Sequence, residues 1–327
     1  MSPTDLIDPA AGRRRQLTAE LQLRQGPGFR HWSRSVASVP RELFVGPFFA
    51  EVDECVWVPV SQDEVGLLSW LNQVYADRTL PIRIGRVFAD GSGQVSGHAT
   101  AVASAPGLVV RLLEGLEVVD GMRVLEIGTG SGYSAALLAH RLGGDQVTSV
   151  DSSSEVTTRA GQAMRQAGLD PQLVVADGLD GYPAGALYDR VISHCSVRFI
   201  PTAWVEQTIP GGLIVAGLRG SLTRDAPIAT LQVKDPATAQ GVFSGGSEQL
   251  LAARTTGSSL ASDGAELTVP PAPGAQRTTA IGPQILDSGT SGVTAQFVAQ
   301  LSLPTVRRVT AGVDRDEVCL VDPLRPR

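Results

Sequence analysis

Between residues 104 and 217, the hydrophobic and polar positions alternate between two regular patterns. Short apolar runs typical of buried strands are followed by segments whose apolar residues recur at helical spacing. The expected strands are 123–127, 146–150, 173–176, 190–193 and 213–216, and the expected helices are 108–116, 134–141 and 154–167. Strands alternating with helices of this length indicate parallel βαβ units. This part of the chain therefore predicts a doubly wound α/β domain.

The first hundred residues are less regular. Residues 33–49 carry apolar positions at helical spacing with a break at Pro40, and residues 67–75 also predict a helix. The run 56–60 predicts a strand. Because Pro59 lies inside it and lacks an N–H donor, an edge strand is expected. The region 1–103 therefore predicts an N-terminal α+β segment on the substrate side of the core 104–217.

Helical periodicity fades after Gly217. Residues 255–262 and 270–276 are rich in Ser, Gly, Thr and Pro and predict a mobile loop. Beyond this loop, residues 295–301 predict a short helix, and residues 306–310 and 318–321 predict two strands joined across a turn at Gly312. Residues 218–327 are therefore expected to form a C-terminal α+β extension with a mobile loop near 255–276.

Charge and composition exclude several classes of function. The 327 residues are 43% hydrophobic and carry a formal net charge of −6. This charge disfavours a nucleic-acid partner, which would require a basic surface. No apolar run is long enough for a membrane span, and the N-terminus lacks the pattern of a signal peptide. A cytoplasmic protein without a membrane or nucleic-acid partner is expected.

Cysteine and histidine are dispersed along the chain. Cys55, Cys195 and Cys319 are odd in number and far apart, and the four histidines are equally scattered. These spacings fit neither a disulfide framework nor a metal site. No metal is therefore expected.

A glycine cluster gives the strongest local signal. Gly128, Gly130 and Gly132 lie directly after an expected strand and directly before an expected helix. Glycines there allow a tight turn and let a ligand approach the backbone at a helix N-terminus. Their G-x-G-x-G spacing differs from the G-x-G-x-x-G typical of dinucleotide sites, which disfavours a nicotinamide dehydrogenase.

Acidic residues end the next two expected strands. Asp151 is placed to accept the hydroxyls of a ribose, and Asp177 with Gly178 is placed to meet an adenine edge. Each acid alone could be an ordinary cap or turn residue. Together with the glycine cluster, and in this order at strand ends, they predict a nucleoside-containing cofactor.

The segment 124–133, VLEIGTGSGY, resembles the first motif of S-adenosylmethionine methyltransferases in the form found in protein-L-isoaspartate O-methyltransferases. The similarity continues through 188–192 and 207–213. It implies a Rossmann-like class I fold, with S-adenosyl-L-methionine as cofactor and S-adenosyl-L-homocysteine as product. The loop 128–132 and Glu126 would hold the methionine end of the cofactor. By the resemblance, the cofactor-binding residues are Glu126, Gly128, Thr129, Gly130, Ser131, Gly132, Tyr133, Asp151, Ser152, Asp177, Gly178 and Ser193.

The resemblance also implies a carboxylate acceptor. Ser104-Ala105-Pro106 stands where the family has a Ser-x-Pro element, whose serine lies beside the reacting carboxylate. The other reading of Ser104 is a helix N-cap before a first turn containing proline. Together with similarities at 39–45 and 75–82, the resemblance covers about residues 36–217. The residues expected to contact substrate are Ser104, which is also the expected catalytic residue, Ala105, Pro106, Ile82, His194 and Cys195; the last two could instead be packing residues at a strand end.

Three departures from the ordinary repair enzyme modify this expectation. Residues 83–103 intervene before the Ser-x-Pro element, 193–201 replace a run of small residues, and the chain continues far past Gly217. These features resemble homologues that accompany ribosomally made peptides and methylate an aspartate side chain, whose ester can cyclise to an aspartimide. We therefore expect a peptide or protein substrate that bears Asp or isoAsp, with such a precursor favoured. General isoaspartyl repair and a non-catalytic S-adenosylmethionine-binding module are the alternatives.

Overall fold

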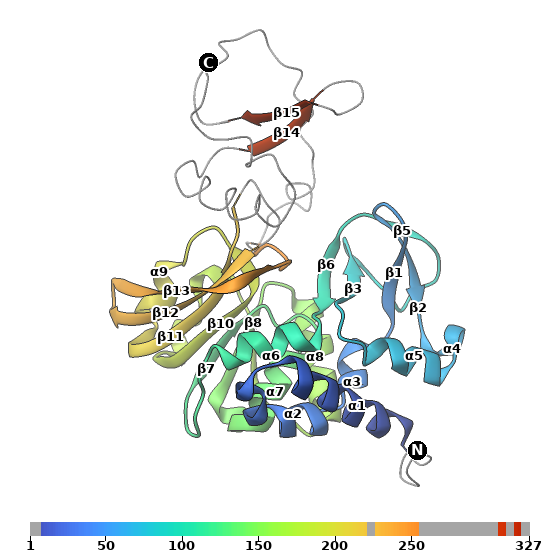
Figure 1. The fold of residues 1–327 in the computed structure, drawn as a ribbon, viewed down its shortest axis with the longest axis horizontal. Helices are drawn as coiled ribbons and strands as arrows, with labels where there is room; N and C mark the ends of the chain where they lie inside the picture. Colours follow the sequence, from blue (N-terminus) through green and yellow to red (C-terminus); the bar gives the residue numbers. More distant parts are fainter. Residues whose placement is uncertain (1–7, 221–225, 255–306, 312–316, 322–327) are drawn as a thin grey trace.

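A twisted seven-stranded sheet forms the centre of the protein (Figure 1). The computed structural model describes residues 8–220, 226–254, 307–311 and 317–321. The strand order is β13-β12-β11-β10-β7-β8-β9, in which β7 to β11 are parallel and β12 and β13 are antiparallel to their neighbours. The strands are β7 (Val124–Ile127), β8 (Val147–Asp151), β9 (Gln172–Val175), β10 (Tyr188–Val197), β11 (Thr208–Leu218), β12 (Ala226–Asp235) and β13 (Thr238–Glu248).

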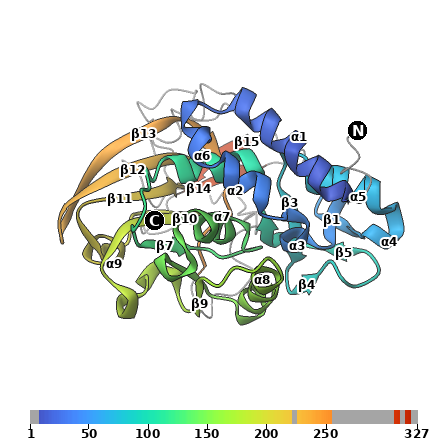
Figure 2. The same cartoon turned by 90° about the horizontal axis from the view of Figure 1, so that it is seen from below.

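Helices cover both faces of this sheet (Figure 2). Successive strand residues point to opposite faces, so Val124 packs into the cluster containing α6, α7 and α8, whereas Leu125 packs into the cluster containing Trp204 of α9. The helices are α1 (Pro9–Arg24), α2 (Ser33–Ser38), α3 (Arg41–Val45), α4 (Gln62–Val65), α5 (Leu67–Val74), α6 (Pro106–Glu114), α7 (Tyr133–Leu142), α8 (Ser154–Gln166) and α9 (Thr202–Glu206). Single 3₁₀ turns lie at η2 (Pro27–His31), η3 (Gly144–Gln146), η4 (Gly178–Asp180) and η5 (Pro183–Gly185). The predicted doubly wound α/β fold is confirmed.

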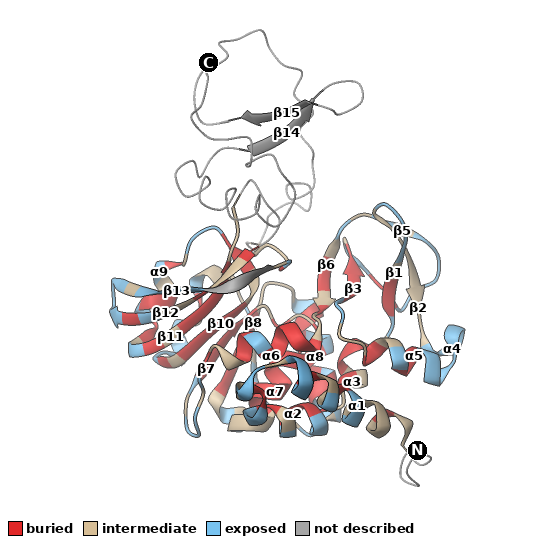
Figure 3. Ribbon diagram, viewed as in Figure 1, coloured by how far each residue is buried: buried red, intermediate tan, exposed pale blue. Residues whose placement is uncertain are grey.

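The buried positions concentrate in the parallel strands and in the helices against them (Figure 3). All four residues of β7 are buried, as expected for a central parallel strand covered on both faces. The sheet also continues beyond Gly217, because β12 and β13 extend it as an antiparallel hairpin. Part of the region expected as a separate extension is therefore integral to the central sheet.

Two small three-stranded sheets stand beside the central one. Their orders are β1-β2-β5 and β4-β3-β6. Their strands are β1 (Phe48–Asp53), β2 (Val56–Val60), β3 (Leu80–Ile84), β4 (Val87–Phe88), β5 (Val95–Ser96) and β6 (Ala99–Ala103). The expectation that 56–60 is an edge strand is wrong, because β2 lies between β1 and β5. Pro59 is tolerated there because β5 pairs only with Val56 and Trp57, which leaves one side of Pro59 without a partner strand.

The last described segments are β14 (Arg307–Ala311) and β15 (Glu317–Val321), which pair antiparallel as the sequence predicts. The turn at Gly312, the loop segments 255–262 and 270–276 and the helix expected at 295–301 lie outside the described residues. Among the described helices, none combines the length and the apolar character that a bilayer crossing requires.

Candidate functional site

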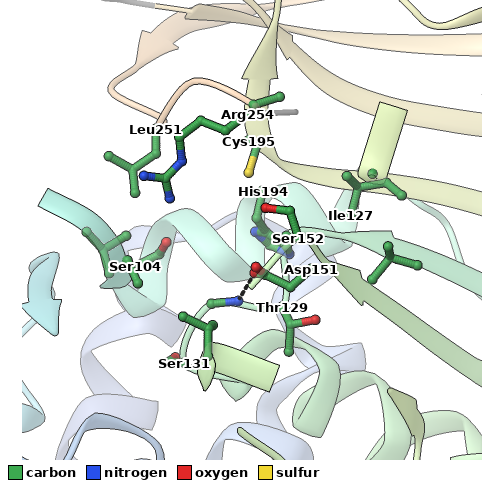
Figure 4. A pocket seen from close by; sticks show the side chains of 18 of the residues that line it. Ser104, Ile127, Thr129, Ser131, Asp151, Ser152, His194, Cys195, Leu251 and Arg254 are labelled. Carbon is green, nitrogen blue, oxygen red and sulfur yellow. Dashed lines mark hydrogen bonds between the residues drawn. The ribbon is translucent and has the colours of Figure 1, made fainter. Parts of the chain in front are cut away.

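A cavity of about 900 Å³, including space open to solvent, lies at the carboxyl ends of β7, β8 and β10 (Figure 4). The chain leaves β7 toward β8 on one side and later returns to place β10 on the other. Ligands of open α/β sheets bind at such a switch point. The lining residues are Thr100, Ala101, Val102, Ser104, Val109, Ile127, Gly128, Thr129, Gly130, Ser131, Tyr133, Ser134, Val150, Asp151, Ser152, Val156, Gly178, Leu179, His194, Cys195, Leu251, Ala252, Ala253 and Arg254.

The glycine loop forms the floor of the cavity. Gly132 has a φ of +88° and begins α7, and a β-carbon there would lie 3.0 Å from both Ala160 and Met164. Glycine is therefore favoured at this position by both conformation and space. Tyr133 and Ser134 of the first turn of α7 line the cavity. Gly132 has no side chain to cap the helix, and Ser131 Oγ accepts a 3.4 Å hydrogen bond from Tyr133 N. The other N–H groups of a helix N-terminus favour an anionic ligand group.

Glu126 lies beneath the glycine loop and is fully buried. Its Oε2 accepts a 2.6 Å hydrogen bond from Ser149 Oγ, which is itself 2.7 Å from Thr129 Oγ1. Its Oε1 lies 3.3 Å from His194 Nε2 but has no hydrogen-bond partner in the described structure. Glu126 therefore stabilises the glycine loop through Ser149 and Thr129, and it does not line the cavity.

His194 links two walls of the cavity. Its Nε2 lies 2.6 Å from Ser134 Oγ in the first turn of α7. His194 and the adjacent Cys195 belong to a bulge of β10, where the pairing with β11 changes register between Ile192 and Ser196. Both residues line the cavity at this bulge, and their contact with substrate stays a prediction.

The carboxylate of Asp151 holds two turns together. Its Oδ2 accepts a hydrogen bond from Gly130 N at 3.1 Å, and its Oδ1 accepts one from Ser153 N at 2.9 Å. A carboxylate has about four acceptor positions, so further capacity remains for ligand hydroxyls. Asp151 therefore has a structural role, and its contact with a ribose stays a prediction.

Asp177 adopts the ordinary capping role that the sequence left open. Its Oδ1 accepts a hydrogen bond from Leu179 N at 3.0 Å, and the residue does not line the cavity. Gly178 does line it, and its carbonyl accepts a 2.8 Å hydrogen bond from Trp204 Nε1. Gly178 therefore lines the cavity and the Asp177 side chain does not, and a contact of either with adenine stays a prediction.

Ser104 lies between β6 and α6 and lines the cavity. The buried Arg41 holds its carbonyl by a 3.0 Å hydrogen bond from Nη2. The N-terminus of α6 is capped from elsewhere, since Asp77 Oδ1 accepts a 2.7 Å hydrogen bond from Gly107 N. Among the described residues, the Ser104 hydroxyl has no hydrogen-bond partner, so it is available to a ligand and is not the cap of α6.

Most of the sequence-predicted site residues lie together around this cavity. Those that line it are Ser104, Gly128, Thr129, Gly130, Ser131, Tyr133, Asp151, Ser152, Gly178, His194 and Cys195. Glu126, Gly132, Asp177, Ser193, Ala105 and Pro106 adjoin it in sequence without lining it, and Ile82 faces a neighbouring hollow that shares Gly130 and Ser131. Ser193 is fully buried, and its hydroxyl donates to the Cys195 carbonyl at 2.8 Å. The ligand contacts of all these residues stay predictions.

Two groups of lining residues were not anticipated from the sequence. Thr100, Ala101 and Val102 come from β6, inside the stretch that intervenes before Ser104, and residues 251–254 come from the segment after β13. Neither carries a recognisable motif. The one available signal is the basic Arg254 directly after the apolar run 250–253.

Within the described part of the chain, no group of three or more His, Cys, Asp or Glu residues is arranged to hold a metal ion. The polar groups around the cavity include backbone N–H groups, hydroxyls, the accepting carboxylate of Asp151, the His194 imidazole and the Arg254 guanidinium. These groups fit a ligand that contains a nucleoside and an amino acid, since they can meet its hydroxyls, its carboxylate and its ring.

Comparison with known proteins identifies the family. The family model of protein-L-isoaspartate(D-aspartate) O-methyltransferase matches residues 68–235, just over half of the chain. The protein-L-isoaspartate O-methyltransferase of Methanoculleus marisnigri is 34% identical over 62% of this chain and 76% of its own length. That of Aeropyrum pernix is 32% identical over 62% of this chain and 64% of its own length, so the match spans somewhat less than two thirds of that relative.

Solved structures agree on the fold. A protein-L-isoaspartate O-methyltransferase superimposes with a TM-score of 0.56 at 23% identity, covering 74% of this chain and 66% of that one. A putative protein-L-isoaspartate O-methyltransferase from Plasmodium falciparum, in complex with S-adenosyl-L-homocysteine, gives a TM-score of 0.50 at 13% identity, covering 73% of this chain and 97% of that one. With its Rossmann-like sheet, its glycine loop and these matches, the chain belongs to the protein-L-isoaspartate O-methyltransferase family and is an S-adenosylmethionine-dependent methyltransferase.

Proposed function

We propose that this enzyme methylates a carboxylate of an aspartyl or isoaspartyl residue in a peptide or protein. The observation that carries the proposal is that Ser104 and the glycine loop line the same cavity (Figure 4). A cofactor on the loop and an acceptor beside Ser104 would then meet in the same space. Holding two reactants in one enclosed site lowers the barrier to transfer.

Residues on the floor and on one wall would hold the cofactor. The first turn of α7 would receive its carboxylate, Asp151 its ribose hydroxyls and Gly178 its adenine. When bound, S-adenosylmethionine supplies an electrophilic methyl group on a sulfonium. The bound group would cover Cys195 and the backbone at Gly128.

The acceptor would need orientation but no proton transfer. A carboxyl group has an ordinary pKa of about 4, so it is already an anion at neutral pH. One carboxylate oxygen gives a lone pair to the methyl carbon while the carbon–sulfur bond breaks and its electron pair stays on sulfur. The Ser104 hydroxyl would donate a hydrogen bond to the other oxygen and hold the group in line. No general base is required.

The thiol in the cavity is unsuited to act as a competing nucleophile. Burial raises the pKa of Cys195 to about 12; the charges of Asp151 and Glu126 raise it as well, while Arg254 opposes them. The thiol is therefore protonated at neutral pH, and a thiolate is the reactive form.

For the acceptor itself we favour an aspartate side chain of a ribosomally made precursor peptide, whose ester would form an aspartimide. The support is the stretch 83–103, which the ordinary repair enzyme lacks and which here builds β4, β5 and β6, with β6 in the cavity wall. Closure would occur when the next backbone nitrogen attacks the ester carbonyl and displaces methanol. General repair of isoaspartyl residues is the alternative, and it fits the family equally well.

Intact-mass spectrometry after incubation with S-adenosylmethionine would decide between the two. The substrates would be an isoaspartyl test peptide and a precursor peptide encoded beside this gene, in linear and cyclised forms. A methyl gain on the precursor, followed by a product one water lighter than the unmodified peptide, supports the tailoring function. Methylation of the isoaspartyl peptide alone supports repair. Cofactor binding without transfer to any of these peptides indicates a non-catalytic module.

A further inference from the structure

The segment that follows β13 is fixed across the carboxyl end of β10. Ser196 N donates to Leu251 O at 2.8 Å, and Ala253 N donates to Ser196 O at 2.9 Å. The Leu250 side chain is 6% exposed and belongs to the hydrophobic core. The bulge of β10 makes room for this pairing, because β10 and β11 change register between Ile192 and Ser196. The segment thus forms a wall of the cavity and is anchored on both sides of Ala252.

Arg254 extends from this anchored wall into the cavity (Figure 4). Its Nη2 donates a hydrogen bond to the Thr100 carbonyl in β6, so the side chain bridges two walls that are far apart in sequence. Ser104 follows β6 on the same side, and it too lines the cavity. The guanidinium therefore lies in the part of the cavity where the acceptor is expected.

The charge of Arg254 is not neutralised by the described protein. None of the ion pairs among the described residues includes Arg254, and the Asp151 carboxylate in the cavity is hydrogen-bonded to Gly130 N and Ser153 N. After burial, the Arg254 charge is the largest cause that lowers the pKa of Arg83, which shows that its positive field extends along this wall. A guanidinium in a partly desolvated cavity favours an anionic partner, carboxylate above all.

We propose that Arg254 is a specificity-determining residue that binds the carboxylate to be methylated. The inference rests on the proposed carboxyl methyl transfer and names the group that recognises the acceptor. Arg254 would donate to the oxygen that does not react, so the attacking oxygen keeps its lone pair. As the oxygen–carbon bond forms and the carbon–sulfur pair passes to sulfur, the carboxylate becomes a neutral ester. The ester loses its charge-assisted bond to Arg254, which favours product release.

The test compares Arg254→Met and Arg254→Lys with Arg198→Met, a matched control that removes an exposed arginine outside the cavity lining. Calorimetry would first measure S-adenosylhomocysteine binding. The loaded proteins would then be titrated with the isoaspartyl peptide and with the linear precursor peptide, each compared with a counterpart that has an amide in place of the acceptor carboxylate. Methyl transfer to both acid peptides would be followed in parallel, and thermal melting would verify that each variant is folded.

Arg254→Met is expected to weaken binding of the acid peptide that the wild type recognises by roughly 10–100-fold and to abolish the preference for acid over amide. The affinity of Arg254→Met for S-adenosylhomocysteine should stay within about twofold of the wild-type value. Arg254→Lys should keep part of the preference for acid, because lysine retains the positive charge but lacks the paired N–H donors of a guanidinium. Arg198→Met should match the wild type.

Two results would overturn the inference. One is wild-type protein that binds acid and amide equally; the other is an Arg254→Met variant that loses cofactor affinity while keeping the acid preference, which would assign Arg254 to the cofactor carboxylate. A different result would contradict the proposed function but not the inference. In that case the wild type would bind the acid peptide through Arg254 but would transfer no methyl group to it.

Discussion

Gly128 and Cys195 are in such close contact that a β-carbon on Gly128 would lie 2.8 Å from the Cys195 sulfur. Gly128 also has a φ of +90°, which side chains rarely adopt. The close contact joins the end of β7 to the bulge of β10, so the glycine loop and the bulge share one packed boundary.

Replacing Gly128 by alanine should weaken cofactor binding for two separable reasons. The left-handed backbone costs roughly 1–2 kcal/mol for a residue with a β-carbon, and the methyl group overlaps the sulfur. We expect S-adenosylhomocysteine affinity, measured by calorimetry, to fall by about tenfold or more. The double variant Gly128→Ala with Cys195→Ala should recover only the affinity lost to the overlap with the sulfur, because the backbone strain remains. Wild-type affinity in the single variant would show that the loop does not need this conformation.

Ser104→Ala should reduce methyl transfer without destabilising the protein. The hydroxyl is free of the α6 cap, so removing it should leave the melting temperature and S-adenosylhomocysteine affinity unchanged. Loss of a hydrogen bond to a charged acceptor should lower kcat by roughly 10–100-fold. Transfer at the wild-type rate would remove Ser104 from the mechanism.

Asp77→Ala is the matched counterpart of that variant. Asp77 accepts hydrogen bonds at the start of α6, and loss of such a cap costs about 1 kcal/mol of stability. Thermal melting should therefore show destabilisation for Asp77→Ala and none for Ser104→Ala. The reverse order would mean that Ser104 caps the helix after all.

Asp151→Ala should raise the Kd for S-adenosylhomocysteine. The substitution removes the expected ribose acceptor and also the bonds that hold Gly130 N and Ser153 N. A loss of about 10–100-fold is expected from hydrogen bonds to a charged group. Asp177→Ala serves as the comparison, since its carboxylate caps η4 outside the cavity lining, and it should bind nearly as the wild type does. Equal Kd values for wild type and Asp151→Ala would refute the ribose contact.

The raised pKa of Cys195, about 12, predicts slow alkylation. At about pH 8 only about one thiol in ten thousand would be ionised, so iodoacetamide should modify Cys195 far more slowly than a free cysteine. The rate should rise steadily with pH, and S-adenosylhomocysteine should suppress it by covering the sulfur. Peptide mapping after timed labelling measures this, and rapid labelling at neutral pH would contradict it.

The same pKa shift has a consequence for stability. The folded protein retains the thiol proton at pH values where the unfolded chain, with an ordinary thiol pKa near 8.5, loses it. The unfolded state therefore binds fewer protons, and the free energy of unfolding should fall as the pH rises above about 8.5. In denaturant titrations, the free energy of unfolding of the Cys195→Ala variant should fall less steeply over that pH range than that of the wild type. Equal slopes of free energy against pH in the two proteins would contradict the raised pKa.

Local patterns along the chain were sufficient to predict the central architecture. Apolar runs such as those of β7 and β8 alternate with helical periodicity, and burial of a parallel sheet on both faces leaves few other arrangements for this pattern. The residues expected to bind the cofactor could also be predicted from local patterns. Gly128 and Gly130 follow β7, Asp151 ends β8, and parallel strands bring their carboxyl ends to one edge of the sheet.

The remaining features could not be predicted from local patterns, because they depend on contacts between residues distant in sequence. Ser104 could be read as a helix cap until Asp77, 30 residues from Gly107, was found to take that role. The strands β12 and β13 complete the sheet beyond the expected boundary. Arg254 reaches the cavity because a bulge in β10 admits its segment, and it meets Thr100 across 154 residues of sequence. Local propensity does not predict such long-range pairings. The positions of Ser104, Thr100 and Arg254 around the cavity therefore depend on the packing of the whole chain.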